Sequence, residues 1–204
     1  MLLNRIEKAL MNNPIRAAVQ RNVEVRYLKQ LGGELGGGKV LEVGCGRGIG
    51  TRLILDEFGA DHVDAFDLDP EMVELARRRL ASDVNRTRLW AGDVTRIEAE
   101  DQTYDAVFDF GIVHHVPDWR LALVEVHRVL KPGGRFFSEE VLKDFILNPI
   151  VRRVLDHPLE DRFTHEEFVQ ELVDVGFHVV GERRIGRTIG WYVADKNERS
   201  TVTG

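Results

Sequence analysis

The sequence is poor in cysteine and in long apolar runs. Only one of its 204 residues is Cys, so no disulfide can form within the chain. It has no run of 18 or more apolar residues, which argues against a membrane-spanning helix. Charged residues interrupt the apolar start too early for a secretory signal. A cytoplasmic protein with one main globular core is therefore expected.

A surplus of positive charge is also missing. The chain has 28 Lys and Arg against 34 Asp and Glu, a formal net charge of -6. Because binding to a phosphate backbone requires a basic surface, general nucleic-acid binding is not expected. The first 39 residues differ from the rest, since they contain seven Lys and Arg against three Glu. This basic leader permits weak contact with an anionic membrane surface.

Glycine clusters mark one internal boundary. Gly32-Gly33 and Gly36-Gly37-Gly38 separate a leader of helical character, residues 3–31, from the remainder. We expect an N-terminal helical cap with a glycine-rich linker over residues 1–38. The main domain is predicted over residues 39–195 and a flexible tail over residues 196–204.

Short apolar runs alternate with segments of helical period in the main domain. Strands are expected at 40–43, 62–66, 88–91, 104–110, 135–141, 177–180 and 189–194, and helices at 49–58, 70–80, 117–130 and 164–175. The run Lys131-Pro132-Gly133-Gly134 is expected to end the third of these helices. The pattern predicts an α/β fold. Its sheet would be Rossmann-like, doubly wound, seven-stranded and mainly parallel, with an antiparallel C-terminal strand pair and the helical cap.

The first predicted strand enters a glycine-rich turn. Gly44, Gly46 and Gly48 lie between this strand and the next helix, where bare backbone and free amides can face a ligand. Glu42 stands two residues before the turn, and its carboxylate would repel a pyrophosphate but suit a ligand with a positively charged amino group. Cys45 is interpreted as a small packed residue of the turn.

Two further acids follow predicted strands. Asp67 lies about 20 residues beyond the turn, where a carboxylate can accept both hydroxyls of a ribose. Asp69 is assigned as the cap of the helix that begins at Pro70. Asp93 follows the third strand and can accept from an adenine amino group, although it is also a common turn residue. Together these acids favour a nucleoside-binding edge of the sheet.

These motifs, with the segments 104–108, 114–116 and 129–135, resemble the class I S-adenosylmethionine-dependent methyltransferases. The resemblance is to the small-molecule group typified by the ubiquinone and menaquinone methyltransferases, and it covers residues 39–141. It implies S-adenosylmethionine as cofactor. By this resemblance the cofactor-binding residues are Glu42, Gly44, Gly46 and Gly48 near the methionine part, Asp67 on the ribose, Leu68 and Val94 around the adenine, Asp93 on its amino group, and the backbone of Asp109 and Phe110 near the methionine amino group. The family often has Ser or Asn at these last two positions.

The chemistry such a cofactor brings requires mainly an aligned acceptor and a dry site. For a hydroxyl or protonated amine acceptor a base is needed, and His114, His115, Glu139 and Glu140 follow the fourth and fifth strands. His115 and Glu140 are the favoured catalytic candidates, while the histidine pair can instead support the turn or the cofactor pocket. No metal site is predicted, because consecutive residues of a strand point to opposite faces.

The acceptor pocket is expected between the N-terminal cap and the insert at residues 142–163. The insert is rich in apolar residues, which favours a small or lipid-like acceptor, although the same residues can pack on the sheet. Two other functions are considered. A nicotinamide-dependent oxidoreductase would have a third glycine at position 49, where this chain has Ile49. The second alternative function is that of a non-catalytic S-adenosylmethionine-binding or assembly module.

Overall fold

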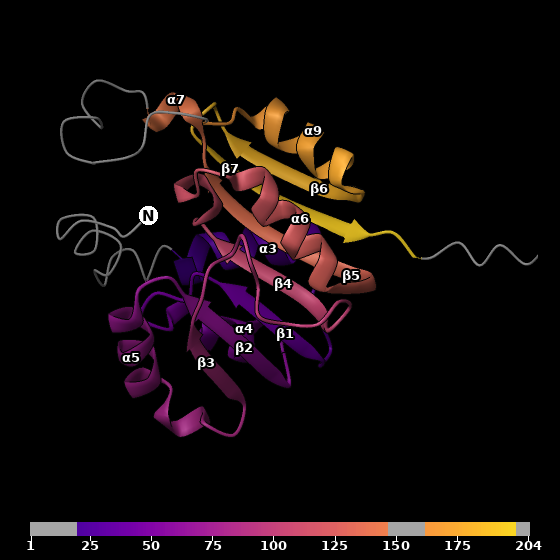
Figure 1. The fold of residues 1–204 in the computed structure, drawn as a ribbon. Helices are drawn as coiled ribbons and strands as arrows, with labels where there is room; N and C mark the ends of the chain where they lie inside the picture. The colour runs from indigo at the N-terminus through magenta and orange to yellow at the C-terminus, as the bar shows by residue number, and fades with distance from the viewer. Residues whose placement is uncertain (1–19, 147–161, 199–204) are drawn as a thin grey trace, which may run out of the picture.

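The computed structural model describes residues 20–146 and 162–198 and contains one mixed sheet (Figure 1). The strand order is β3-β2-β1-β4-β5-β7-β6. Strands β1 to β5 pair with one another in parallel, and β7 is antiparallel to both β5 and β6, so the predicted fold class is confirmed. The strands are β1 Lys39–Val43, β2 His62–Asp67, β3 Thr87–Ala91, β4 Tyr104–Phe110, β5 Leu130–Val141, β6 Phe177–Ile185 and β7 Ile189–Lys196.

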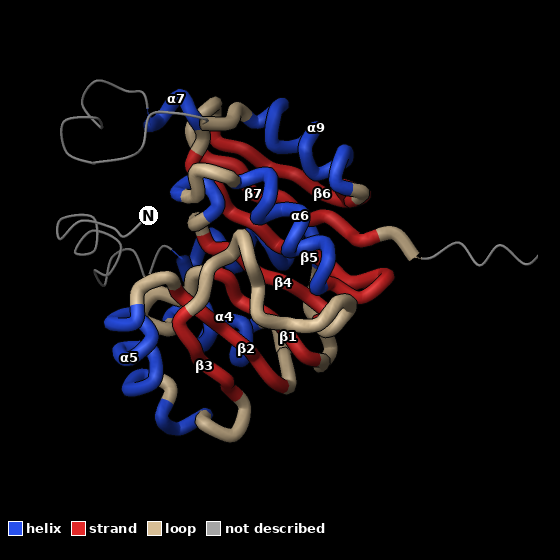
Figure 2. The backbone as a smooth tube through the Cα atoms, viewed as in Figure 1, coloured by secondary structure: helices blue, strands red, loops and turns tan. Residues whose placement is uncertain are grey.

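Helices cover both faces of the sheet (Figures 1 and 2). On one face α6 and α9 pack on a core that includes residues of β4, β5 and β7, and on the other α3 and α4 pack on a second core. Each apolar strand face is thereby removed from water. The helical elements are η1 Gln20–Glu24, α3 Val25–Gly32, α4 Ile49–Glu57, α5 Pro70–Arg79, η2 Ala81–Asp83, η3 Val113–His115, α6 Trp119–Val129, α7 Lys143–Ile146 and α9 His165–Val175.

Local sequence sets several helix boundaries. The Asp69 side chain accepts from the backbone N of Glu71 at 3.0 Å, so the predicted cap of α5 is confirmed. Thr164 and Glu167 form a reciprocal capping box at the start of α9. Gly176 ends α9 with a left-handed φ of 109°, as a C-terminal glycine does.

Two predicted boundaries around α6 are wrong. The helix begins at Trp119, two residues late, because the Asp118 side chain caps it by accepting from the backbone N of Leu121. The fifth strand does not begin at residue 135 as predicted, since β5 begins at Leu130, directly after α6, and includes the run 131–134. The register with β4 shifts across this run, so the glycines are accommodated as an irregularity of the strand.

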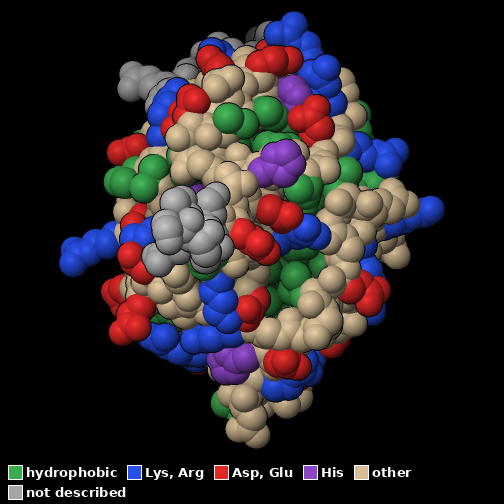
Figure 3. Space-filling model, turned by 90° about the vertical axis from the view of Figure 1, so that its right-hand side faces the viewer, with side chains coloured by type: hydrophobic (Ala, Val, Ile, Leu, Met, Phe, Trp, Pro, Cys, Tyr) green, Lys and Arg blue, Asp and Glu red, His purple; other side chains and the backbone are tan. Residues whose placement is uncertain are grey.

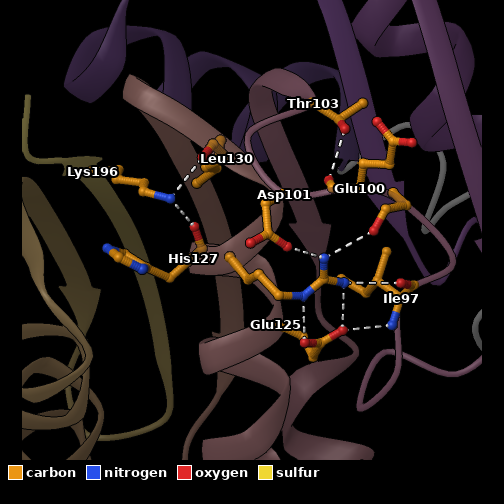
Figure 4. A network of polar contacts seen from close by, with 10 residues as sticks. Ile97, Glu100, Asp101, Thr103, Glu125, His127, Leu130 and Lys196 are labelled. Carbon is orange, nitrogen blue, oxygen red and sulfur yellow. Dashed lines mark hydrogen bonds and ion pairs between the residues drawn. The ribbon is translucent and has the colours of Figure 1, made fainter.

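The C-terminal strands are longer than predicted. Strand β6 continues to Ile185 and β7 to Lys196, because each residue pairs with the other strand beyond the apolar segment that the sequence reveals. The ammonium group of Lys196 donates to the backbone carbonyls of His127 and Leu130, at 2.7 and 2.8 Å (Figure 4). These two bonds join the end of β7 to the end of α6.

An arginine network closes the edge of the sheet where the parallel strands begin (Figure 4). Arg128 donates to both carboxylate oxygens of Glu125 at 2.7 and 2.8 Å and to Asp101 at 2.8 Å. It also donates to the carbonyls of Ile97 and Ala99. The guanidinium fork thus fixes the segment before β4 against α6. On the surface at this end, acidic and basic side chains lie side by side (Figure 3).

We expect Arg128→Met to lower the free energy of unfolding by about 2 kcal/mol, because it leaves a partly buried carboxylate and two carbonyls without this donor. Urea denaturation monitored by circular dichroism measures the change. The control is Arg78→Met, whose side chain is 73% exposed and pairs with Glu74 one helical turn away. The control is expected to change stability by less than about 0.5 kcal/mol. Equal losses in the two variants would contradict the role assigned to the network.

Candidate functional site

The predicted site residues gather where the parallel strands end, at the left of Figure 1. Val43 of β1 lies beside Phe66 of β2 and Asp109 of β4, so the residues that follow these three meet at one level. The chain proceeds from β1 to β2 and β3 on one side, and to β4 and β5 on the other. Ligands of open α/β sheets bind at such a reversal of strand order.

The glycine turn after β1 has a conformation that needs glycine. The φ angles of Gly44, Gly46 and Gly48 are 72°, 49° and 78°. A Cβ at Gly44 would also overlap the side chain of Ile112, which follows β4. The turn therefore lies tightly between two strand ends.

Asp67 contacts this turn directly. Its Oδ2 accepts from the backbone N of Gly46 at 2.8 Å, and its Oδ1 accepts from the backbone N of Asp69 at 2.9 Å. The carboxylate thus joins the end of β2 to the glycine turn. The sequence indicates that Asp67 lies on the binding edge but not that it also holds the turn.

Glu42 is buried beneath the turn, with 1% of its surface exposed. Its Oε2 accepts from the hydroxyl of Thr51 in α4, and a Cβ at Gly50 would overlap its other oxygen. Burial, with a smaller effect of the nearby carboxylates of Asp67 and Asp109, raises the pKa of Glu42 to about 8, although the hydrogen bond from Thr51 lowers it. A positively charged ligand group would favour ionisation of this carboxyl. Sequence analysis missed Thr51 and Gly50, although both lie in the helix that follows the glycine turn.

The residues predicted around an adenine have different surroundings. Leu68 is 45% exposed beside the end of β2, whereas Val94 is only 4% exposed and belongs to the core on the α6 side. Asp93 is exposed, and its Oδ1 accepts from the backbone N and the hydroxyl of Thr95, at 2.9 and 2.8 Å. Asp93 thus also has the turn role that its sequence context allowed.

Asp109 and Phe110 end β4. Asp109 is fully buried, its Oδ1 accepts from the backbone N of Ile112 at 2.8 Å, and its Oδ2 accepts from the Ser138 hydroxyl at 3.0 Å. Burial, followed by the nearby Glu140, raises the pKa of Asp109 well above its usual value. Phe110 is 8% exposed and its ring stacks on Phe108. The Asp109 side chain therefore holds the turn after β4.

The histidine pair lies in η3, one short helical turn after β4. The rings of His114 and His115 are 4.2 Å apart between centroids, so the expectation that the two side chains point to opposite faces is wrong. A strand alternates its side chains, but this turn places the rings side by side. Glu140 accepts from the ring Nδ1 of His114 at 2.6 Å and from its backbone N at 3.1 Å. Sequence analysis did not single out His114 as the partner of Glu140.

Other predicted features fall outside the described residues. These are most of the N-terminal cap, residues 1–19, most of the insert, residues 147–161, and the end of the tail. Within residues 20–146 and 162–198, no three or more His, Cys, Asp and Glu side chains are grouped as metal ligands. In the same part of the chain, no helix has the length and hydropathy needed to cross a membrane.

The fold and this edge define a Rossmann-like domain of the class I methyltransferases, in which S-adenosylmethionine is the methyl donor. The residues fit that cofactor, because a Cβ at Gly46 would meet no atom within 4 Å, so space lies open against the glycine turn, and Leu68 leaves an apolar surface exposed. Residues 40–134 match the family described as "Methyltransferase domain". Residues 40–134 thus form a methyltransferase domain, and the fold is that of the class I S-adenosylmethionine-dependent methyltransferases.

Three comparisons illustrate the likeness. Over 112 residues, 54% of this chain, it is 32% identical to "Phosphoethanolamine N-methyltransferase 2" of Caenorhabditis elegans, covering 25% of that protein. Over 126 residues, 61% of this chain, it is 35% identical to "Demethylmenaquinone methyltransferase" of Staphylococcus aureus, covering 51% of that protein. The structure of a SAM-dependent methyltransferase from Aquifex aeolicus superposes with a TM-score of 0.75 at 22% identity, over 96% of this chain and all of that one. This chain thus spans about a quarter of the length of the first sequence relative and about half of the length of the second.

Proposed function

We propose that this protein transfers the methyl group of S-adenosylmethionine to a small or lipid-like acceptor. The observation that carries the proposal is the joining of the glycine turn at Gly46 to Asp67, directly above the buried Glu42. The acid at the neighbouring strand end can bind the ribose, and the bare backbone of the turn can bind the methionine chain. The buried carboxyl can bind a positively charged group.

Each part of the cofactor is assigned a group of the chain. The ribose hydroxyls would bond to Asp67, and the exposed Leu68 would cover one side of the adenine. Glu42, once ionised, would favour the positively charged methionine part. The remaining proposed cofactor contacts are the backbone of Gly44, Gly46 and Gly48, the carboxylate of Asp93, the side chain of Val94, and the backbone of Asp109 and Phe110.

The bound cofactor supplies an activated methyl group on a sulfonium. The protein's task is to orient the acceptor and to exclude water. We assign His115, which is partly exposed beside the fully buried Glu140 cluster, as the group that accepts the acceptor's proton. Glu140, the other residue that the sequence predicts as catalytic, is fully buried and bonds to His114.

The acceptor class rests on the insert and the N-terminal cap. The insert at residues 142–163 is apolar in sequence, which favours a small or lipid-like molecule. The two named relatives act on very different molecules, a phosphoethanolamine and a demethylmenaquinone, so their names do not select between polar and apolar acceptors. We retain the division into a cap at 1–38, a methyltransferase domain at 39–195 and a tail at 196–204, although the first residue of that tail, Lys196, ends β7. We also retain a cytoplasmic location, with weak contact to an anionic membrane surface through the basic leader.

Asp67→Ala is expected to weaken binding of S-adenosylhomocysteine at least 100-fold, because it removes the ribose acceptor and the bond to Gly46. Isothermal calorimetry measures the dissociation constant. The control is Asp69→Ala, which removes the α5 cap two residues away. The control should lose about 1 kcal/mol of stability and keep its affinity.

The same titration separates the alternative functions. Retained affinity in Asp67→Ala would overturn the proposed cofactor site. Binding of NAD in place of S-adenosylhomocysteine would indicate an oxidoreductase. Binding of S-adenosylmethionine without methyl transfer to any acceptor would indicate a non-catalytic module.

A further inference from the structure

Glu140 and His114 form a buried pair behind the partly exposed His115. Both side chains are nearly inaccessible, with 0% and 4% of their surface exposed. The Oε2 atom of Glu140 accepts two hydrogen bonds from His114, one from the ring Nδ1 at 2.6 Å and one from the backbone N at 3.1 Å. Glu140 therefore fixes both the backbone and the ring of His114.

This contact sets the tautomer of His114. A histidine nitrogen that bonds to a carboxylate carries the proton, so Nδ1 of His114 is the protonated nitrogen. The ring of His114 is also the surface on which the ring of His115 lies, at 4.2 Å and 38° between planes. The backbone of the turn supports this arrangement, since His115 N donates to the carbonyl of Ile112 at 2.8 Å. A change at Glu140 would therefore reach His115 through His114.

Other groups around the pair are placed on four elements. Asp109 on β4 holds the same turn through Ile112 N and also lies against Glu140. Glu139, the next residue of β5, lies on the other face of the sheet, where its Oε2 accepts from the Trp191 indole at 3.1 Å. Tyr192 on β7 faces Glu140, and its hydroxyl lies 3.1 Å from Nδ1 of His165 in α9.

Burial changes the pKa of both carboxyls in the same direction. Burial, followed by the nearby Glu140, raises the pKa of Asp109 well above its usual value. Burial also raises the pKa of Glu140, to about 7, while its hydrogen bonds with Asp109 and the His114 backbone oppose the rise. Of the two carboxyls, Glu140 is the one that contacts His114, at its ring Nδ1 and its backbone N.

We propose that Glu140 is a positioning residue that acts through His114 to orient His115, and that it does not itself touch the acceptor. The use of an oriented His115 as a base rests on the proposed methyl transfer. The arrangement itself is a property of the protein alone. It replaces the direct role of Glu140 in proton transfer by an indirect one.

The test is the pH titration of the histidine ring nitrogens by NMR in the full chain labelled with 15N-histidine. His114→Gln and His115→Gln assign the two rings. In the unsubstituted protein we expect His114 to hold a proton on Nδ1 across the titration. In Glu140→Gln, which keeps an oxygen but removes the charge, the titration midpoint of His114 should fall by about 1 pH unit or more and that of His115 should move as well. In Glu140→Ala, His114 should lose its preference for the Nδ1 tautomer.

The matched control is Glu139→Gln, the neighbouring buried carboxyl that bonds to Trp191 on the opposite face. It should leave the His114 tautomer intact and move both midpoints much less. Unchanged histidine signals in Glu140→Gln, or a His115 curve that stays fixed while that of His114 moves, would overturn the proposal. Calorimetry with S-adenosylhomocysteine, run beside it, tests the proposed function separately. If the unsubstituted protein does not bind S-adenosylhomocysteine but the NMR shifts are as expected, the proposed function is overturned. The coupling of Glu140 to His115 through His114 would then still hold.

Discussion

Gly44→Val is expected to abolish measurable binding of S-adenosylhomocysteine. The φ of Gly44 is 72°, in the region that β-branched residues avoid, and a Cβ there would overlap Ile112. Ile112 cannot withdraw freely, because its backbone N donates to the buried Asp109. The new side chain would therefore displace the glycine turn, the turn after β4, or both, and it would occupy the surface proposed for the methionine part. Calorimetric titration measures the effect.

The control for backbone strain is Gly59→Val. Gly59 has a φ of 77°, and a Cβ there meets no atom within 4 Å. Its substitution introduces similar strain, of the order of 1–3 kcal/mol, between α4 and β2 without the overlap. We expect a lower melting temperature with unchanged affinity. If Gly59→Val loses binding equally, or Gly44→Val retains it, the assigned place of the cofactor is wrong.

The second large effect is a pH dependence that Glu42 imposes on cofactor affinity. With a pKa of about 8 in the ligand-free protein, Glu42 is mostly protonated at neutral pH. If the positively charged methionine part favours its ionised form, binding releases a proton. The affinity for S-adenosylhomocysteine should then rise by up to about tenfold per pH unit between pH 6 and 8. In Glu42→Gln this dependence should disappear, and affinity at pH 8.5 should be lower.

The same carboxyl affects the stability of the ligand-free protein in the opposite direction. Its pKa is higher in the folded chain than the ordinary 4.5, so the folded state holds more protons than the unfolded state between these values. The contribution of Glu42 to the free energy of unfolding is therefore fully present below about pH 4.5. It falls as the pH rises to about 8, by up to about 1.4 kcal/mol per pH unit. Glu42→Gln should flatten this decline in urea denaturation curves.

Glu98→Gln serves as the control for both measurements, because Glu98 is exposed after β3. It should keep the pH dependence of affinity and of stability. Calorimetry in buffers of different ionisation enthalpy counts the released proton directly. An affinity that is independent of pH in the unsubstituted protein would show that Glu42 does not ionise on binding.

The sequence by itself determined the order of the elements and the edge of the sheet at which the predicted site residues gather. Apolar runs of strand length alternate with helical periods, and this alternation permits few folds other than a parallel sheet between helices. Caps such as Asp69 and Thr164 are local, since each acts on backbone two or three residues away, and both were predictable. Glu42, Asp67 and Asp93 each lie within two residues of the end of a strand, and parallel strands end at one edge.

The tertiary structure alone decided which side chains meet. The hydrogen bond of Asp67 with Gly46 joins residues 21 apart, and that of Glu140 with His114 joins residues 26 apart. Neither separation corresponds to a period of helix or strand, so no local pattern indicates these contacts. They depend on strand register and on the short turn after β4, which placed His114 rather than His115 against Glu140. Burial is likewise a property of the assembled sheet, and it is the largest cause of the raised pKa of Glu42 and of Asp109, because charge is disfavoured once the surrounding elements have removed water.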